Sequence, residues 1–170
     1  GGTGIAVGGQ SLGTTLINNI VTAKGSGYCL FVATENALSD SDYNDYYAYG
    51  GASVARWLAL ATWHTASSLV DWQRASALDH SSFGRDPLFA ASASGDFHLR
   101  SAGGTWSGSA WTAYTVTSPC IDAGDPVADY AAEPAPNGGR VNLGAYGGTA
   151  QASKSSAPRM LALLSPMGGE

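Results

Sequence analysis

The sequence predicts an all-β fold, a solenoid of short stacked parallel strands, and three observations favour it. The stretch GIAVGG near the N-terminus is followed 25 residues later by CLFVAT, which aligns Ile5 with Leu30 and Val7 with Val32. A repeat of this length is typical of solenoids, in which each turn buries its apolar residues only against its neighbours. Both stretches alternate as strands do, and 23 glycines with only 12% charged residues favour strands joined by tight corners.

The repeat extends beyond these two strands. The same offset aligns Asn19 with Asn44 and Val21 with Tyr46. Stacked asparagines at one corner predict a ladder of side-chain amide hydrogen bonds along the solenoid. The repeat is lost after residues 1–50, which are therefore the range expected to hold the β-helical turns.

One short helix is expected at 67–76, in the stretch SSLVDWQRAS. Ser68 is followed three residues later by Asp71, as in a helix capping box. Trp72 lies three residues after Leu69, which is helical spacing. We expect this ring to anchor the helix in the core.

Two further strands are expected later in the chain. GDFHLR at 95–100 alternates apolar and polar residues, and NGGRVNLGAYGG at 137–148 does the same after an Asn-Gly turn. The side chains expected on the buried faces are those of Phe97, Leu99, Val141, Leu143 and Ala145.

The charge and the cysteines narrow the choice of partners. A net charge of -5 and a pI near 4.9 leave no basic surface for phosphates, so no nucleic acid is expected as a partner. No run of about 18 apolar residues is present, so no membrane insertion is expected. Cys29 and Cys120 fit no metal-binding spacing, and they are either joined in a disulfide or buried as two free thiols.

Six short motifs occur in a fixed order: SDYNDYY, DWQRA, DPLF, GDFHL, SPCIDAGDP and GGRVNLGAYGGT. Together they resemble the last turns of right-handed parallel β-helix proteins of the pectate-lyase-like superfamily, from large secreted bacterial multidomain proteins. The resemblance implies the C-terminal part of such a protein, with a terminal turn and a cap at 51–150 that contains the short α-helix. It also implies a linker and the start of a following β-sandwich module at 151–170.

In this family the stretch SPCIDAGDP ends the fold. The resemblance implies that Pro119 and Pro126 stop strand pairing and that Ile121 points into the last layer. Asp122 and Asp125 would then accept hydrogen bonds from backbone N–H groups at the turns.

Four aspartates are candidate calcium ligands, because calcium prefers carboxylate oxygens. Asp40 and Asp42 lie two residues apart in SDSDYND, which places them on one face of a strand. A polar outer face is the alternative explanation for this pair. Asp122 and Asp125 have the right oxygens but lack the spacing of a calcium loop. Calcium is the one candidate cofactor.

The resemblance implies polysaccharide lyases and glycoside hydrolases among the relatives, but neither catalytic signature is present. The cationic residues are scattered, without the R-x-P-x-x-R pattern of the lyases. The chain has no adjacent Asp-Asp pair, and none of its histidines lies between glycines, as the hydrolases of this scaffold require. No catalytic residue is therefore assigned.

Aromatic side chains are the best candidates for a ligand site. Exposed rings stack on the apolar faces of sugars while neighbouring polar groups bind the hydroxyls. Two tryptophans lie in a Gly/Ser-rich loop with little else apolar, and the other rings could equally seal the end of the solenoid. The candidate carbohydrate-binding residues are Trp106, Trp111, Tyr46, Tyr49, Trp57 and Trp63.

These features predict a secreted protein, extracellular or at the cell surface, that acts as a non-catalytic polysaccharide-binding or surface-display module. One alternative is a part of a polysaccharide lyase or glycoside hydrolase whose active site lies on upstream turns outside this chain. Another is a structural stalk or adhesin spacer. The expected partners are polysaccharide and the adjacent domains of the same parent chain.

Overall fold

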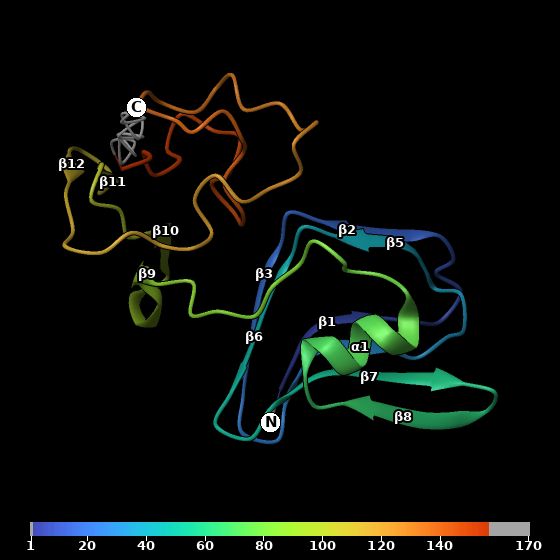
Figure 1. The fold of residues 1–170 in the computed structure, drawn as a ribbon. Coiled ribbons are helices and arrows are strands. Elements are labelled where there is room, and N and C mark those ends of the chain that lie inside the picture. The colour runs from blue at the N-terminus through green and yellow to red at the C-terminus, as the bar shows by residue number, and fades with distance from the viewer. Residues whose placement is uncertain (1, 157–170) are drawn as a thin grey trace, which may run out of the picture.

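The computed structural model describes residues 2–156, and Figure 1 shows their arrangement. Strands β1 to β8 and one helix form the N-terminal half, whereas the C-terminal half consists of short strands joined by long turns. The strands are β1 (Thr3–Val7), β2 (Thr14–Ile17), β3 (Ile20–Lys24), β4 (Tyr28–Val32), β5 (Leu38–Asp42), β6 (Asp45–Tyr49), β7 (Ser53–Ala59), β8 (Thr62–Ala66), β9 (Phe89–Ala91), β10 (Asp96–Leu99), β11 (Thr105–Trp106) and β12 (Trp111–Thr112). The helices are α1 (Leu69–Ser76) and the 3-10 turn η1 (Ser92–Ser94). Within 2–156, no helix is long and apolar enough to cross a membrane.

The repeat in the sequence appears as a strand register. β4 lies between β1 and β7, and these three strands run parallel. Ile5 pairs with Leu30 and Val7 with Val32, as the offset predicted. β2 pairs with β5 and β3 with β6, also in parallel. The alignment of the two stretches is therefore confirmed at the level of individual residues.

The asparagine ladder is also confirmed. The side-chain amide of Asn19 donates to Oδ1 of Asn44 over 3.0 Å, and the backbone N–H of Asn19 donates to the same atom over 2.9 Å. The amide of Asn44 in turn donates to the carbonyl of Leu16 over 2.8 Å. Asn18 and Tyr43, just before the two asparagines, have positive φ, so the backbone turns sharply at this corner.

The predicted right-handed parallel β-helix is nevertheless wrong. Among the described residues the strands form several small separate sheets, one of four strands and four of two, and none of them is closed or continues as a solenoid. In the four-stranded sheet, parallel pairing ends at β7 because the chain reverses at Leu60 and Ala61, which both have positive φ. β8 therefore runs antiparallel to β7, and the β9–β10 and β11–β12 pairs are antiparallel too.

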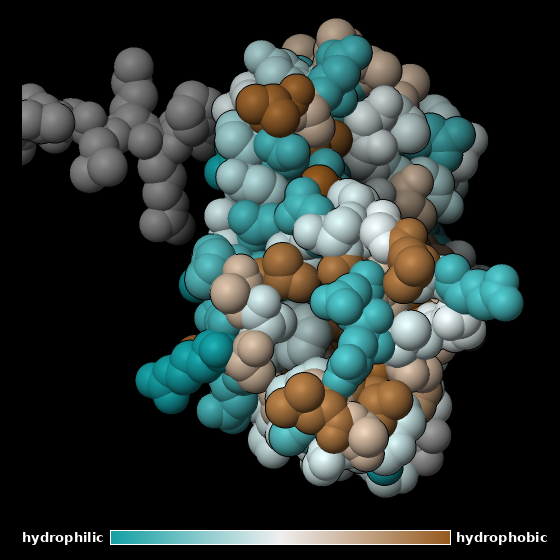
Figure 2. Space-filling view, turned by 90° about the vertical axis from the view of Figure 1, so that its right-hand side faces the viewer, coloured by the Kyte–Doolittle hydropathy of each residue, from teal (hydrophilic) through white to brown (hydrophobic). Residues whose placement is uncertain are grey.

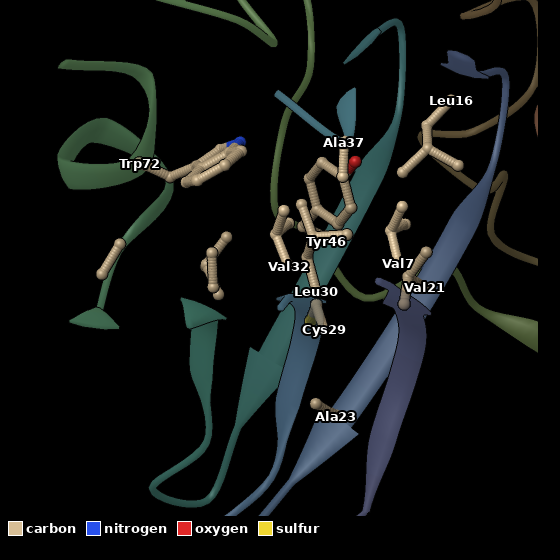
Figure 3. Packing of buried hydrophobic residues seen from close by; sticks show 13 residues of the cluster. Val7, Leu16, Val21, Ala23, Cys29, Leu30, Val32, Ala37, Tyr46 and Trp72 are labelled. Atoms are coloured by element: carbon tan, nitrogen blue, oxygen red, sulfur yellow. The ribbon is translucent and has the colours of Figure 1, made fainter. Parts of the chain in front are cut away.

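Two hydrophobic clusters form the core. The first lies among the strands of the N-terminal half and α1 (Figure 3), and consists of Val7, Leu16, Val21, Ala23, Cys29, Leu30, Val32, Ala37, Tyr46, Val54, Ala55, Ala66 and Trp72. The second lies in the C-terminal half and consists of Leu99, Cys120, Ile121 and Leu143. Burial of Ile121 agrees with its expected inward position. Cys29 and Cys120 are free and buried, one in each cluster, so the two-thiol alternative holds.

The expected helix is present and begins at its expected cap. The hydroxyl of Ser68 accepts a hydrogen bond from the backbone N–H of Asp71 over 3.2 Å and donates to the Asp71 carboxylate over 2.7 Å. Trp72 is only 3% exposed, as predicted, and its ring packs edge-on against that of Trp57 with centroids 5.4 Å apart. The helix is therefore held by both its cap and its buried ring.

A buried carboxylate ties the loop after α1 to the corner before β6. Asp79 is 1% exposed. Its carboxylate accepts four hydrogen bonds, from the hydroxyls of Ser41 and Ser82, the amide of Asn44 and the indole N–H of Trp72. We call this group of side chains the Asp79 hub.

The strand expected at 95–100 is present as β10, but its predicted alternation is only half right. Leu99 is buried, whereas Phe97 is 46% exposed and His98 is only 7% exposed. The pairing of β10 with β9 is irregular between Asp96 and Leu99, which breaks the two-residue period. The His98 ring also stacks on Tyr146, with centroids 3.6 Å apart, and this contact holds it inside.

The strand expected at 137–148 is absent, and these residues form bends and turns. Val141 and Leu143 are buried as predicted, but Ala145 is exposed.

The side chain of the buried Glu133 explains why no strand forms at 137–148. Oε1 of Glu133 accepts the backbone N–H groups of Asn142 and Gly148, each over 2.8 Å. Because these donors bond to a side chain, the segment has no need of a strand partner.

Residues 151–156, expected to begin a linker, pack against earlier parts of the chain. Ala152, Ser153 and Ser155 are buried, and the N–H of Lys154 donates to the carbonyl of Gly104 over 2.8 Å. The rest of the predicted linker and of the following module, 157–170, lies outside the described residues.

Candidate functional site

A partly enclosed pocket lies between the outer face of the β3–β6 sheet and the β9–η1–β10 segment. Its volume is about 290 Å³. The lining residues, here called the aromatic pocket, are Thr22, Tyr47, Tyr49, Asp86, Pro87, Phe89, Ser92 and Phe97. The two walls come from segments far apart in the sequence, which the fold brings together.

The first wall follows from strand alternation. Tyr47 and Tyr49 are two residues apart in β6 and therefore share one face, while Tyr46, the residue before Tyr47, points into the core. Their rings stack with centroids 4.9 Å apart and planes at 16°. Thr22 of β3 pairs with Tyr47, and Lys24 pairs with Tyr49 and holds its ammonium 5.9 Å from that ring.

The second wall adds two more rings and a carboxylate. Phe89 and Phe97 pack edge to face, with centroids 5.3 Å apart. Tyr49 and Phe97 are 41% and 46% exposed, large fractions for aromatic side chains in a folded protein. Asp86 is also exposed, and its Oδ1 accepts the N–H of Leu88 over 2.9 Å, which fixes the carboxylate beside the rings. The pocket therefore offers apolar faces together with hydroxyl and carboxylate oxygens.

A buried aspartate at the joint between the two halves supports this wall. Oδ1 of Asp45 accepts the N–H of Arg85, the residue before Asp86, over 2.9 Å. The thiol of Cys120 donates to Oδ2 over 3.2 Å. Asp45 is fully buried, and this burial raises its pKa to about 6, against the opposing effect of the Arg85 N–H.

Stability is expected to fall as the pH rises from about 4 to about 6. The unfolded chain releases the Asp45 proton near pH 3.8, whereas the folded protein keeps it until about pH 6. The stability that the protonated carboxyl provides is thus complete below the lower value and lost above the upper one, by up to about 3 kcal/mol. Urea unfolding at several pH values measures this loss.

Asp45→Asn is the matched control for this pH dependence, because it keeps the shape and removes the titration. Burial also raises the pKa of Glu133, with the same sign of effect, and this contribution remains in the variant. The difference between wild type and Asp45→Asn therefore isolates Asp45. Parallel pH profiles of the two proteins would contradict the assignment.

The predicted aromatic residues fall in several places, and of these only Tyr49 lines the pocket. Trp106 and Trp111 face each other across the β11–β12 hairpin, with ring centroids 5.3 Å apart and planes tilted by 55°. The Lys154 ammonium lies 4.2 Å from the centre of the Trp111 ring. This hairpin is a second exposed aromatic surface, separate from the pocket.

Tyr46 is 1% exposed, and its hydroxyl lies 3.1 Å from that of Ser41, so it belongs to the core. Trp63 is 43% exposed and stacks on Phe31 with centroids 5.1 Å apart. Arg56 covers the Trp63 ring at 5.1 Å. Trp63 is thus partly exposed on the outer face of the four-stranded sheet, although Phe31 and Arg56 both contact its ring.

Trp57 lines a different, mostly apolar pocket of about 330 Å³ between α1, the end of β7 and the turn before β5. The Trp57 ring stacks on the His64 ring, with centroids 5.3 Å apart. Figure 2 shows hydrophobic side chains gathered at the lower end of this side of the molecule, over the end of the β7–β8 hairpin. Leu60, at the turn of that hairpin, is 90% exposed.

The four candidate calcium ligands do not come together. Within the described part of the chain, no group of three or more His, Cys, Asp or Glu side chains could hold a metal ion. Asp42 accepts the N–H groups of Tyr43 and Ser81, and Asp40 is exposed on the same strand.

The aspartates of SPCIDAGDP have the role that was expected of them at the turns. Oδ1 of Asp122 accepts the N–H of Gly138 over 2.9 Å. Oδ1 of Asp125 accepts the N–H of Val127 over 3.0 Å.

Sequence reasoning missed Tyr47, Asp86, Phe89 and Phe97. Alternation in DYYAY could have found Tyr47, because it shares a face with Tyr49. Phe97 was assigned to the buried face of a regular strand, and nothing in the local pattern signals the irregular pairing that exposes it.

The sequence model of a family described as disaggregatase related matches residues 64–124, which is less than half of the chain. The matched stretch includes α1, the second wall of the pocket and Cys120. The resemblance to pectate-lyase-like β-helix proteins is wrong, because the family that matches is a different one and the sheets form no solenoid. Neither the curated proteins nor the solved structures contain a match.

Proposed function

We propose that this chain is a non-catalytic polysaccharide-binding module and that a sugar unit occupies the aromatic pocket. One observation supports this most directly: four aromatic rings, two of them phenols, line a single pocket together with two aliphatic hydroxyls and a carboxylate. The rings offer apolar surface to the C–H faces of a sugar ring, and the oxygens accept or donate hydrogen bonds to its hydroxyls. An extracellular or cell-surface location accompanies this proposal.

The lining favours binding over cleavage. Glycoside hydrolysis uses a pair of carboxyl groups on either side of the scissile bond. Among the described residues that line the pocket, Asp86 is the one acid. The family description is disaggregatase related, a term that refers to the separation of aggregates. Binding to the material that holds an aggregate together is a role that agrees with this description.

Tyr49→Ala is expected to weaken retention on insoluble polysaccharide about tenfold, which corresponds to about 1.4 kcal/mol of binding free energy. The substitution removes the exposed ring of the first wall, and because this ring is 41% exposed we expect the fold to be retained. Pull-down on cellulose, xylan and pectin, with circular dichroism to check folding, measures the effect.

Trp111→Ala is the control, because it removes an exposed ring outside the pocket. Loss of retention in Tyr49→Ala together with unchanged retention in Trp111→Ala places the sugar in the aromatic pocket. Loss of retention in Trp111→Ala but not in Tyr49→Ala would assign the sugar to the β11–β12 hairpin instead. Wild-type protein that is retained on none of the three polysaccharides would favour a structural spacer.

A further inference from the structure

We propose that Asp45 is a positioning residue for the aromatic pocket, whose carboxyl group docks the second wall onto the first and makes this docking depend on its own protonation. The effect of Asp45 on sugar binding rests on the proposed function. The docking of the two walls does not, because it occurs in the protein without a ligand. Asp45 itself is buried and does not line the pocket.

The geometry places Asp45 at the joint of the two walls. The segment after α1 lies along the start of β6, where the N–H of Phe83 donates to the carbonyl of Asn44 and the N–H of Tyr46 donates to that of Phe83. The bond from the Arg85 N–H to Asp45 continues this pairing. Asp86, which supplies the carboxylate of the pocket, follows Arg85 directly in the sequence.

Asp45 also contacts the second hydrophobic cluster, because the thiol of Cys120 donates to its Oδ2. Its negative charge adds to the effect of burial in raising the pKa of the Cys29 thiol, which belongs to the first cluster. The charged groups that face Asp45 are Arg85 and Asp86, both on the second-wall segment. The Asp86 carboxylate repels the ionised form of Asp45, while the Arg85 side chain attracts it.

Ionisation weakens the joint because the charge has few strong donors. A fully buried carboxylate here accepts one backbone N–H and one thiol, and a thiol is a weak donor. The neutral carboxyl keeps its acceptor for the Arg85 N–H without the cost of a buried charge. Separation of residues 85–87 from β6 would expose the carboxylate to water, so ionisation favours this opening. The second wall is therefore docked most firmly at acidic pH.

Native-state hydrogen exchange of the Arg85 amide, corrected for the intrinsic rate of exchange, tests the proposal. In wild type we expect protection of this amide to fall about tenfold between about pH 5 and about pH 7.5 and to stay below that of the β4 amides, which report global unfolding and lose the same factor because global unfolding also exposes Asp45. In Asp45→Asn, which keeps an acceptor for the same N–H, protection should be equal at both pH values. Equal protection in wild type at both pH values, or the same fall in Asp45→Asn, would overturn the proposal.

Retention on xylan and pectin at the same two pH values separates this inference from the proposed function. Stronger retention of wild type at the lower pH, with no pH effect in Asp45→Asn, supports both. If protection of the Arg85 amide depends on pH but the protein binds neither polysaccharide, the docking role of Asp45 is supported and the proposed function is contradicted. If the protein is retained but protection of the Arg85 amide does not depend on pH, the proposed function is supported and the role of Asp45 is contradicted.

Discussion

Asp79→Ala is expected to lower the free energy of unfolding by about 4 kcal/mol. The carboxylate is buried, and its removal leaves four donors of the Asp79 hub without their acceptor. Each buried donor that loses its partner costs about 1–3 kcal/mol, and partial re-pairing within the hub reduces the sum. Urea unfolding followed by tryptophan fluorescence and circular dichroism measures the loss, provided that the slope with urea is unchanged.

Backbone strain contributes to this loss and can be measured separately. Asp79 has a φ of 60°, where alanine is disfavoured, and exposed Asn36 has nearly the same value of 59°. Asn36→Ala should therefore cost only about 1 kcal/mol. Asp79→Asn keeps both an acceptor for the hydroxyls and a tolerance of this φ, and should lie between the two. A loss in Asp79→Ala no greater than in Asn36→Ala would show that the hub contributes nothing to stability.

Gly147→Ala is expected to cost about 3 kcal/mol, because a methyl group at this position has no room. A Cβ atom would lie 2.0 Å from the backbone carbonyl oxygen of Asn142. Asn142 cannot move away, since its N–H is bound by Glu133 and its side-chain amide donates to the carbonyl of Ser153. For a protein of this size the midpoint of thermal unfolding should fall by about 6–12 °C.

Gly2→Ala is the control for this substitution. Gly2 does not have positive φ, and no atom lies within 4 Å of the position that its Cβ would take. It should therefore change stability by less than about 0.5 kcal/mol. A similar midpoint for both variants would mean that the loop around Gly147 yields without cost.

The parts of the fold that the sequence predicted are those in which a local pattern is tied to a physical requirement. Parallel strands that share a core must repeat the same inward residues, so the alignment of Ile5 with Leu30 predicted the register. The hydroxyl of Ser68 and the carboxylate of Asp71 meet only if a helix begins there, so the capping box predicted α1. Neither pattern carries information on how far the stacking continues.

The fold class was wrong because the reversal after β7 has no signal in the sequence. Leu60 and Ala61 both adopt positive φ, a conformation that glycine and asparagine favour and that apolar residues rarely take. The strand expected at 137–148 failed for a related reason. The carboxylate of Glu133 lies outside that segment and bonds donors that a strand partner would have taken.

The sequence predicted candidate aromatic residues but not where aromatic rings gather in the fold. The sequence pointed to exposed aromatic rings, and Tyr49 was among the residues named. The pocket, however, forms only when β6 and the segment that contains Phe97 lie side by side, and single-sequence patterns do not report such contacts. Tyr46, which was also named, alternates with Tyr49 out of phase and is buried.

The two buried thiols give each half of the molecule its own chemical reporter. Cys29 belongs to the first cluster and Cys120 to the second, and burial raises the pKa of both, to about 12 for Cys29. Thiolate, the form that alkylating reagents attack, is therefore scarce at neutral pH while either cluster stays closed. The order in which the two sulfur atoms become reactive during denaturation will show which half opens first.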